Sequence, residues 1–344
     1  MGGWRRRALG WFLEFRLIPV LLWSYTAVAL GTALAYADGG GIDLGWLAVS
    51  MALAGLVQGW VTHAVNEVYD WRSGTDRDGS PRALSGGSKV LGLGLLTERD
   101  LWTIWAVSTA IVAGLSVLVG LMRAWWLVLL IATGYGLGIA YTLPPLATAY
   151  RPFAGEWLGG FPGVLLAGLG AYGIQALRVS WTAVAALTAH ALVCTAMLVM
   201  HHYVDAPADA TARPEKRTTV VVLGPRRARA YAAVLAGGAA ALYAGLGLAA
   251  HPAFLLGAAL TVPAALFHLR TDPTDLKAVT RNELRIIQLG IAAGIAPAVF
   301  LAPPLWPLLP LAAVGYFAHL ATVSPPTGLA RAWRPAPATE AKRR

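Results

Sequence analysis

The chain has 344 residues, of which 57% are hydrophobic and only 13% are charged, and its net charge is +10. Soluble domains carry about 25% charged residues, whereas here long uncharged windows alternate with charged clusters. This pattern excludes a soluble enzyme, a disordered chain and a nucleic-acid-binding protein as first interpretations, and predicts a lipid bilayer as the partner of the basic loops.

Ten apolar segments are long enough to cross a membrane, which requires about 20 residues each. The last two are separated only by Pro303 and Pro304, so they form either one kinked element or a tight hairpin. The sequence therefore predicts an all-α, polytopic membrane bundle of nine to ten transmembrane helices. The expected spans are 17–37, 45–69, 101–121, 125–143, 157–177, 181–203, 228–250, 252–269, 285–302 and 305–323.

Basic residues are distributed unevenly over the connections between these spans. With a cytoplasmic N-terminus and ten spans, all but two of the 27 Lys and Arg residues, namely Arg123 and Arg178, lie on the cytoplasmic side. The positive-inside rule favours this topology over nine spans. We expect a multi-pass protein of the cell membrane, in which residues 1–323 form a single membrane-embedded domain and 324–344 form a disordered cytoplasmic tail.

The loop after the second span carries acidic residues where that span leaves the membrane on the cytoplasmic side. Asn66 and Asp70 are four residues apart and therefore share one face of a helix. Gly74 is expected to end this helix, which lets Asp76 fold back towards Asp70. Carboxylate and amide oxygens at this spacing suit Mg²⁺, which binds one or two carboxylates together with substrate phosphates.

The loop after the sixth span repeats the pattern with Asp205 and Asp209, again four residues apart. Two acidic clusters on one membrane face suggest two metal sites around one polyanion. The alternative is that these carboxylates are only solvated loop charges. A zinc or iron site at His201 and His202 is disfavoured, because adjacent histidines do not share a helix face and no third ligand is near in sequence.

Basic residues close to both acidic clusters could neutralise the remaining charge of a metal-bound diphosphate. The segment 85–89, Ser-Gly-Gly-Ser-Lys, could add a nest of backbone N–H groups for phosphate oxygens, or could be a plain turn. The basic candidates are Arg72, Lys89, Lys216 and Arg217.

The motifs Asn66-x3-Asp70-x5-Asp76 and Asp205-x3-Asp209 resemble the two aspartate-rich motifs of the UbiA superfamily of intramembrane prenyltransferases. Their order, after spans two and six, is also similar, and so is the basic-Thr stretch at 216–224. This resemblance implies a central cavity, open to the cytoplasmic side and to lipid, in a Mg²⁺-dependent enzyme. Such an enzyme transfers a polyprenyl group from a prenyl diphosphate to an aromatic acceptor.

Within the superfamily, three features resemble the 1,4-dihydroxy-2-naphthoate branch, which makes menaquinone. They are the five-residue gap between Asp70 and Asp76, the segment 85–91, and the segment 141–156. The chain departs from that branch at His201-His202, where asparagines are common, and by two extra residues before Lys216. The three shared features imply 1,4-dihydroxy-2-naphthoate as the acceptor.

The resemblance also implies a role for each candidate residue. Tyr141 and Tyr203 lie at the depth where an aromatic face could stabilise an allylic cation. Glu156 begins the fifth span, where a carboxylate is unfavourable without a partner, and it is expected on the acceptor side. The expected Mg²⁺ ligands are Asn66, Asp70, Asp76, Asp205 and Asp209, and the expected diphosphate ligands are Arg72, Lys89, Lys216 and Arg217.

Two other functions remain open at this stage. A terpene cyclase or another prenyl-diphosphate-using relative would keep the diphosphate site but need no aromatic acceptor. A transporter of an anionic substrate is less favoured, because acidic residues of transporter sites lie near the bilayer midplane and here they lie at span exits.

Overall fold

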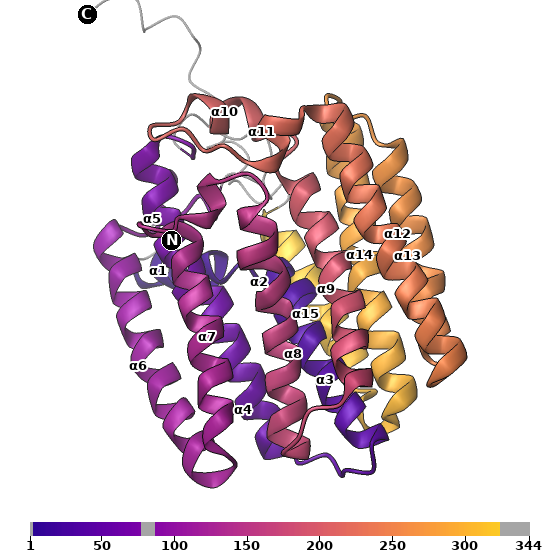
Figure 1. The fold of residues 1–344 in the computed structure, drawn as a ribbon. Helices are drawn as coiled ribbons and strands as arrows, with labels where there is room; N and C mark the ends of the chain where they lie inside the picture. Colours follow the sequence, from indigo (N-terminus) through magenta and orange to yellow (C-terminus); the bar gives the residue numbers. More distant parts are fainter. Residues whose placement is uncertain (1–2, 77–86, 324–344) are drawn as a thin grey trace, which may run out of the picture.

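A computed structural model describes residues 3–76 and 87–323, and within these ranges the chain is helical and contains no strand (Figure 1). Nine helices of the described residues are long and apolar enough to cross a membrane, and a tenth apolar helix, at Phe254–Arg270, is shorter. The predicted all-α bundle of nine to ten spans is confirmed. The predicted tail, 324–344, and Ser85 and Gly86 of the predicted nest lie outside the described residues.

The first span is preceded by a separate helix. Helix α1 (Gly3–Phe15) ends at Arg16, whose φ of 50° is left-handed and therefore stops the α-helical run. The span then continues as α2 (Leu17–Val20), a π-helical turn η1 (Leu21–Tyr25) and α3 (Thr26–Ala37).

The second and third spans begin at recognisable signals in the sequence, and the fourth begins after an uncapped Ala124. Asp43 caps the second span by accepting a hydrogen bond from Trp46 N (3.1 Å), and Thr97 and Asp100 form a capping box at the start of the third. The second span contains a π-helical turn, η2. These spans are α4 (Leu44–Gly55), η2 (Leu56–Thr62) and α5 (His63–Ser73), then α6 (Glu98–Met122) and α7 (Trp125–Thr142).

The remaining helices include the hairpin that the sequence left undecided. Helix α14 ends at Leu301 and α15 begins at Leu308, because Pro303 and Pro304 lack the amide hydrogens needed to extend α14. The last two predicted spans are therefore two helices. The elements are η3 (Thr148–Tyr150), η4 (Glu156–Gly160), α8 (Phe161–Ala176), α9 (Trp181–His201), α10 (Ala206–Thr211), α11 (Thr219–Leu223), α12 (Pro225–Ala249), α13 (Phe254–Arg270), α14 (Leu276–Leu301), η5 (Pro303–Leu305) and α15 (Leu308–Val323).

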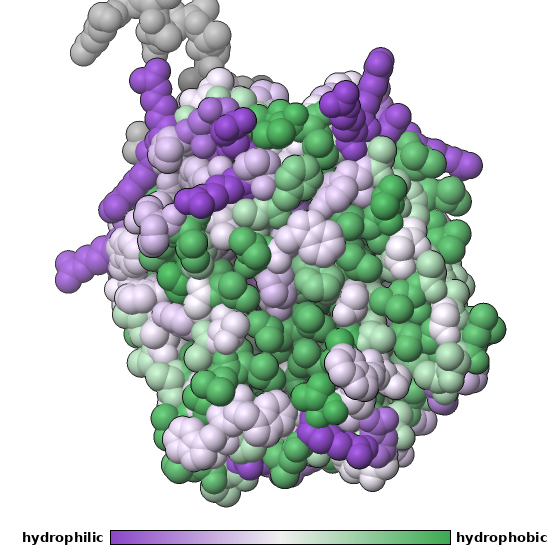
Figure 2. All heavy atoms as spheres, in the orientation of Figure 1, coloured by the Kyte–Doolittle hydropathy of each residue, from purple (hydrophilic) through white to green (hydrophobic). Residues whose placement is uncertain are grey.

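Small residues let the central helices approach closely. A Cβ added at Gly31 of α3 would collide with the carbonyl oxygen of Gly168 in α8, so these backbones touch where only glycine fits. The visible outer face is apolar across its middle and hydrophilic towards its two ends (Figure 2), which suits a membrane-embedded bundle. Helices α10 and α11 and the end of α5 lie together at one end of the bundle (Figure 1).

We predict that a reporter fused after Arg344 is cytoplasmic. Helix α13 has 17 residues, or about 26 Å at ~1.5 Å per residue, which is long enough to cross the apolar core. Ten crossings return the C-terminus to the side of the N-terminus. The measurement is a pair of fusions, one reporter active only in the cytoplasm and one active only outside it. An external C-terminus would mean that one of these helices does not cross.

Candidate active site

The end of α5 carries the first acidic motif in the folded-back form that the sequence predicts. Gly74 has a φ of 90°, a left-handed conformation that glycine adopts without strain, and it ends the helix after Ser73. The chain then turns back, so that Asp76 N donates a hydrogen bond to Asp70 O over 3.2 Å. The side chains of Asp70 and Asp76 are both buried at this turn.

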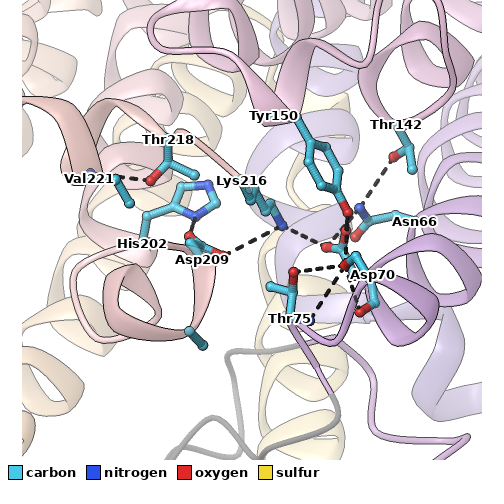
Figure 3. Close-up of polar contacts among 12 residues, drawn as sticks. Asn66, Asp70, Thr75, Thr142, Tyr150, His202, Asp209, Lys216, Thr218 and Val221 are labelled. Atoms are coloured by element: carbon cyan, nitrogen blue, oxygen red, sulfur yellow. Dashed lines mark hydrogen bonds and ion pairs between the residues drawn. The ribbon is translucent and has the colours of Figure 1, made fainter. Parts of the chain in front are cut away.

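Asp70 is the centre of a polar network (Figure 3). Its Oδ1 accepts a hydrogen bond from the Tyr150 hydroxyl (2.7 Å), and its Oδ2 accepts from Lys216 Nζ (2.6 Å) and from Asn66 Nδ2 (3.1 Å). Asn66 Nδ2 also lies 3.2 Å from the Thr142 hydroxyl oxygen. Asp70 thus joins α5 to η3 and to the second acidic loop, and Asn66 joins α5 to α7.

The second acidic motif is folded by its own backbone. Asp209 lies on the short helix α10, and its N–H donates to the carbonyl of Asp205 over 2.9 Å. The N–H of Lys216 donates in turn to the carbonyl of Asp209 (3.0 Å), which closes the loop and brings the ammonium 4.0 Å from Asp209 Oδ1. His202 Nδ1 lies 3.5 Å from the other oxygen of this carboxylate, Oδ2.

A main-chain hydrogen bond joins the two acidic loops. The N–H of Arg213, in the second loop, donates to the carbonyl of Ser73, at the end of α5, over 2.9 Å. The two loops are separated by four spans along the chain. This contact and the Lys216–Asp70 ion pair hold both aspartate pairs at one end of the bundle.

Both aspartate pairs open into one cavity of ≈ 270 Å³. Its lining extends along α8 from Gly163 to Ile174, a rise of about 16 Å at ~1.5 Å per residue. Leu53 and Leu130 line it together with Ile174, so its deep part is apolar. The π-helical turns η1, η2 and η4 all contribute lining residues, which places all three irregular turns at the cavity.

The charges at the cavity mouth are strongly coupled. Burial, together with the nearby carboxylates of Asp70 and Glu67, raises the pKa of Asp76 well above its ordinary value. Burial opposes the charged form of Lys216, but Asp70 and Asp209 outweigh it and raise the pKa of this ammonium well above its ordinary value. The mouth therefore holds a charged lysine among more carboxylates than it can pair.

Most of the predicted site residues line this cavity, but some do not. Lys89 lies beside the cluster, where the charges of Asp76 and Asp205 act on it. Arg72 is exposed and pairs with Glu98 (2.6 Å), and Arg217 is exposed as well. Glu156 and Tyr203 are buried without lining the cavity. The predicted residues that line it are Asn66, Asp70, Asp76, Tyr141, Asp205, Asp209 and Lys216.

The structure adds residues that sequence reasoning did not place in the site. Tyr150 and Thr142 orient Asp70 and Asn66, and Arg16, at the break after α1, lines the cavity. Glu283 of α14 also lines it and lies 2.8 Å from His201 Nδ1. Tyr150 had a signal in the sequence, because it lies within the segment 141–156 that resembles the naphthoate branch.

The donor set fits a hard divalent cation that is shared with a substrate. Oδ2 of Asp76 and both carboxylate oxygens of Asp209 are buried and accept no hydrogen bond within residues 3–76 and 87–323. In the same ranges no three His, Cys, Asp or Glu side chains converge tightly enough to enclose a metal by themselves. Mg²⁺ suits such a site, because it takes one or two carboxylates and fills its remaining positions with phosphate oxygens and water.

Comparison with known proteins gives a family and a fold. The model of the UbiA prenyltransferase family matches residues 22–284, and no curated protein sequence matches the chain. An apo structure of a UbiA homolog from Aeropyrum pernix K1 is similar at 17% identity and a TM-score of 0.60, over 79% of this chain and 96% of that chain. A UbiA homolog from Archaeoglobus fulgidus bound to GPP and Mg²⁺ is similar at 19% identity and a TM-score of 0.58, over 83% and 99%.

Proposed function

Because the chain belongs to the UbiA prenyltransferase family, we propose that it transfers a polyprenyl group from a prenyl diphosphate to 1,4-dihydroxy-2-naphthoate, at the cytoplasmic face of the cell membrane and with Mg²⁺. The observation that carries the proposal is the convergence of two buried aspartate pairs and Lys216 at the mouth of one deep apolar cavity. A molecule with an anionic head and a long apolar chain is complementary to such a cavity.

The residues at the mouth are suited to the diphosphate end of the donor. Mg²⁺, when bound, neutralises the diphosphate and stabilises the charge that develops on the leaving oxygen. Lys216 is held in place by Asp70 and Asp209, and together with Lys89 it supplies positive charge for the remaining phosphate oxygens. The residues proposed to hold the metal are Asn66, Asp70, Asp76, Asp205 and Asp209.

The apolar walls are suited to the prenyl end. When the carbon–oxygen bond of the donor breaks, an allylic cation forms, and an apolar cavity keeps it from water. Tyr141 lines the cavity near its mouth, and its aromatic face is proposed to stabilise this cation. Tyr203 and Glu156 are buried and do not line the cavity.

The acceptor is tested by competition between two aromatic acids for one donor. We expect 1,4-dihydroxy-2-naphthoate to be prenylated in preference to 4-hydroxybenzoate, because its ring is electron-rich and its carboxylate can leave as CO₂. The measurement is the mass of the products from the purified protein, Mg²⁺ and one prenyl diphosphate. A prenylated benzoate, or a cyclised prenyl product without an acceptor, would overturn the naphthoate assignment while leaving the diphosphate site intact.

A further inference from the structure

Ser88 is held by two buried carboxylates from different helices. Its hydroxyl donates to Glu14 Oε2 of α1 and its N–H donates to Glu67 Oε2 of α5, each over 2.6 Å. The two glutamates are 0% and 2% exposed. Neither lines the cavity, and each carboxylate accepts one hydrogen bond from Ser88.

The backbone on both sides of Ser88 is fixed as well. Gly87 has a φ of 75°, and a Cβ added to it would lie 2.5 Å from Asp76 Oδ2 and would collide with the Glu67 carboxylate. Val90 is fully buried in an apolar cluster that includes Leu13, and its N–H points to the Ser88 hydroxyl oxygen over 3.4 Å. The chain is thus held immediately before and after residue 89.

Lys89 lies between these fixed residues and adopts a φ of 66°, which is strained for a residue with a side chain. The charges of Asp76, Asp205 and Glu67 all act on its ammonium. A lysine is a flexible point charge, and it binds an anion more tightly when its backbone is already in place, because less freedom is lost on binding. The surroundings of Ser88 supply this restraint.

We propose that Glu14 and Glu67 are positioning residues, which act through Ser88 to fix the backbone of Lys89 so that its ammonium meets the donor diphosphate. The inference rests on the proposed role of Lys89 as a diphosphate ligand. Two carboxylates near an anion site weaken anion binding by Coulomb repulsion. Their contribution to binding therefore lies in the hydrogen bonds to Ser88 and not in their charge.

Two single substitutions separate the hydrogen bond from the charge. Ser88→Ala removes the hydroxyl and keeps both carboxylates, whereas Glu14→Gln removes a charge and keeps an acceptor oxygen. The probe is inorganic pyrophosphate with Mg²⁺, whose affinity is measured by calorimetry on the full-length protein in detergent. We expect Ser88→Ala to weaken binding about tenfold and Glu14→Gln not to weaken it. A purely electrostatic role predicts the reverse, with Glu14→Gln tighter and Ser88→Ala unchanged.

A double-mutant cycle tests whether Ser88 acts through Lys89. In a Lys89→Met background, Ser88→Ala is expected to cause no further loss, because the group that it positions is already absent. Ser88→Thr keeps the hydroxyl and is expected to retain wild-type affinity. Glu98→Gln removes a carboxylate that pairs with Arg72 and not with Ser88, and it serves as the matched control, with no loss of affinity.

Turnover supplies an independent measurement. Ser88→Ala is expected to raise the KM for the prenyl diphosphate about tenfold and to leave kcat and the KM for the acceptor close to wild type. Pyrophosphate affinity within twofold of wild type in Ser88→Ala, or an undiminished effect in the Lys89→Met background, would overturn the inference. A wild-type protein that binds pyrophosphate but prenylates no aromatic acceptor would instead contradict the proposed function and leave this inference standing.

Discussion

Replacing Asp70 by asparagine is expected to lower prenyl transfer by at least about 100-fold, the effect of removing one well-placed charged group from a site of this kind. Asp70 is a proposed metal ligand, and its two carboxylate oxygens also receive the hydrogen bonds of Tyr150 and Lys216. Asparagine keeps the shape of the side chain and one acceptor oxygen but removes the charge. The measurement is the initial rate with saturating donor and acceptor.

The same substitution has a consequence for folding that its position at a span exit does not predict. Lys216 and Asp70 are both buried, and removing one partner of a buried ion pair destabilises a protein by about 3–5 kcal/mol. Thermal unfolding should accompany the assay, and rates are compared only for protein that is folded at the assay temperature. Asp272→Asn, at an exposed carboxylate of the same end of the bundle, is the control that should keep full activity.

Folded Asp70→Asn protein with a rate close to wild type would show that this cluster is not the diphosphate site. Tyr150→Phe provides a graded comparison, because it removes one hydrogen bond to Asp70 and keeps the carboxylate charge. Its expected loss is about tenfold, since one hydrogen bond to a charged group is lost.

Removing divalent cations with excess EDTA is expected to abolish turnover, and adding Mg²⁺ in excess of EDTA is expected to restore it. The buried oxygens of Asp76 and Asp209 that accept no hydrogen bond within the described residues would then face the diphosphate without a bridging cation. The negative charges of the carboxylates and of the diphosphate repel each other strongly in a buried site that contains little water. The measurement is product formation after metal-free dialysis, with the residual metal content determined.

A control separates loss of the metal from loss of the fold. The helical circular dichroism of the EDTA-treated protein should match that of the untreated protein, because the bundle is held by apolar packing and not by the metal. Full turnover in metal-free protein would contradict the assignment of the aspartates as Mg²⁺ ligands.

The membrane spans could be predicted from the sequence because an apolar run of sufficient length has few other folded states. The break at Arg16 could not, since a left-handed arginine is locally unfavourable and is stabilised only by the contacts of the complete fold. The pairs Asn66–Asp70 and Asp205–Asp209 could be predicted from the sequence, because residues four apart lie on the same face of a helix. The end of α5 could also be predicted, because Gly74 is a typical residue at a helix C-terminus.

The position of Arg72 outside the cavity has a simple geometric cause. Two residues after Asp70 on the same helix, it lies on nearly the opposite face, where it pairs with Glu98 instead of facing the cavity. Glu67, three residues before Asp70, lies on the same face of α5 as Asp70, so its position near the site could have been predicted from the sequence. The pairing of His201 with Glu283, by contrast, joins residues 82 positions apart, and no local pattern predicts it.

The hydrogen bond between the Arg213 amide and the Ser73 carbonyl also bears on how this site can change during evolution. A main-chain contact survives almost any exchange of side chains, so point substitutions alter the chemistry at the mouth without separating the two aspartate pairs. Insertions and deletions in the two loops are the changes that can break this main-chain hydrogen bond. The loop before Lys216 is closed in the same way, because the amide of Lys216 donates to the carbonyl of Asp209. An insertion or deletion in this loop is therefore compatible with the same placement of the two aspartate pairs only where these two main-chain hydrogen bonds are kept.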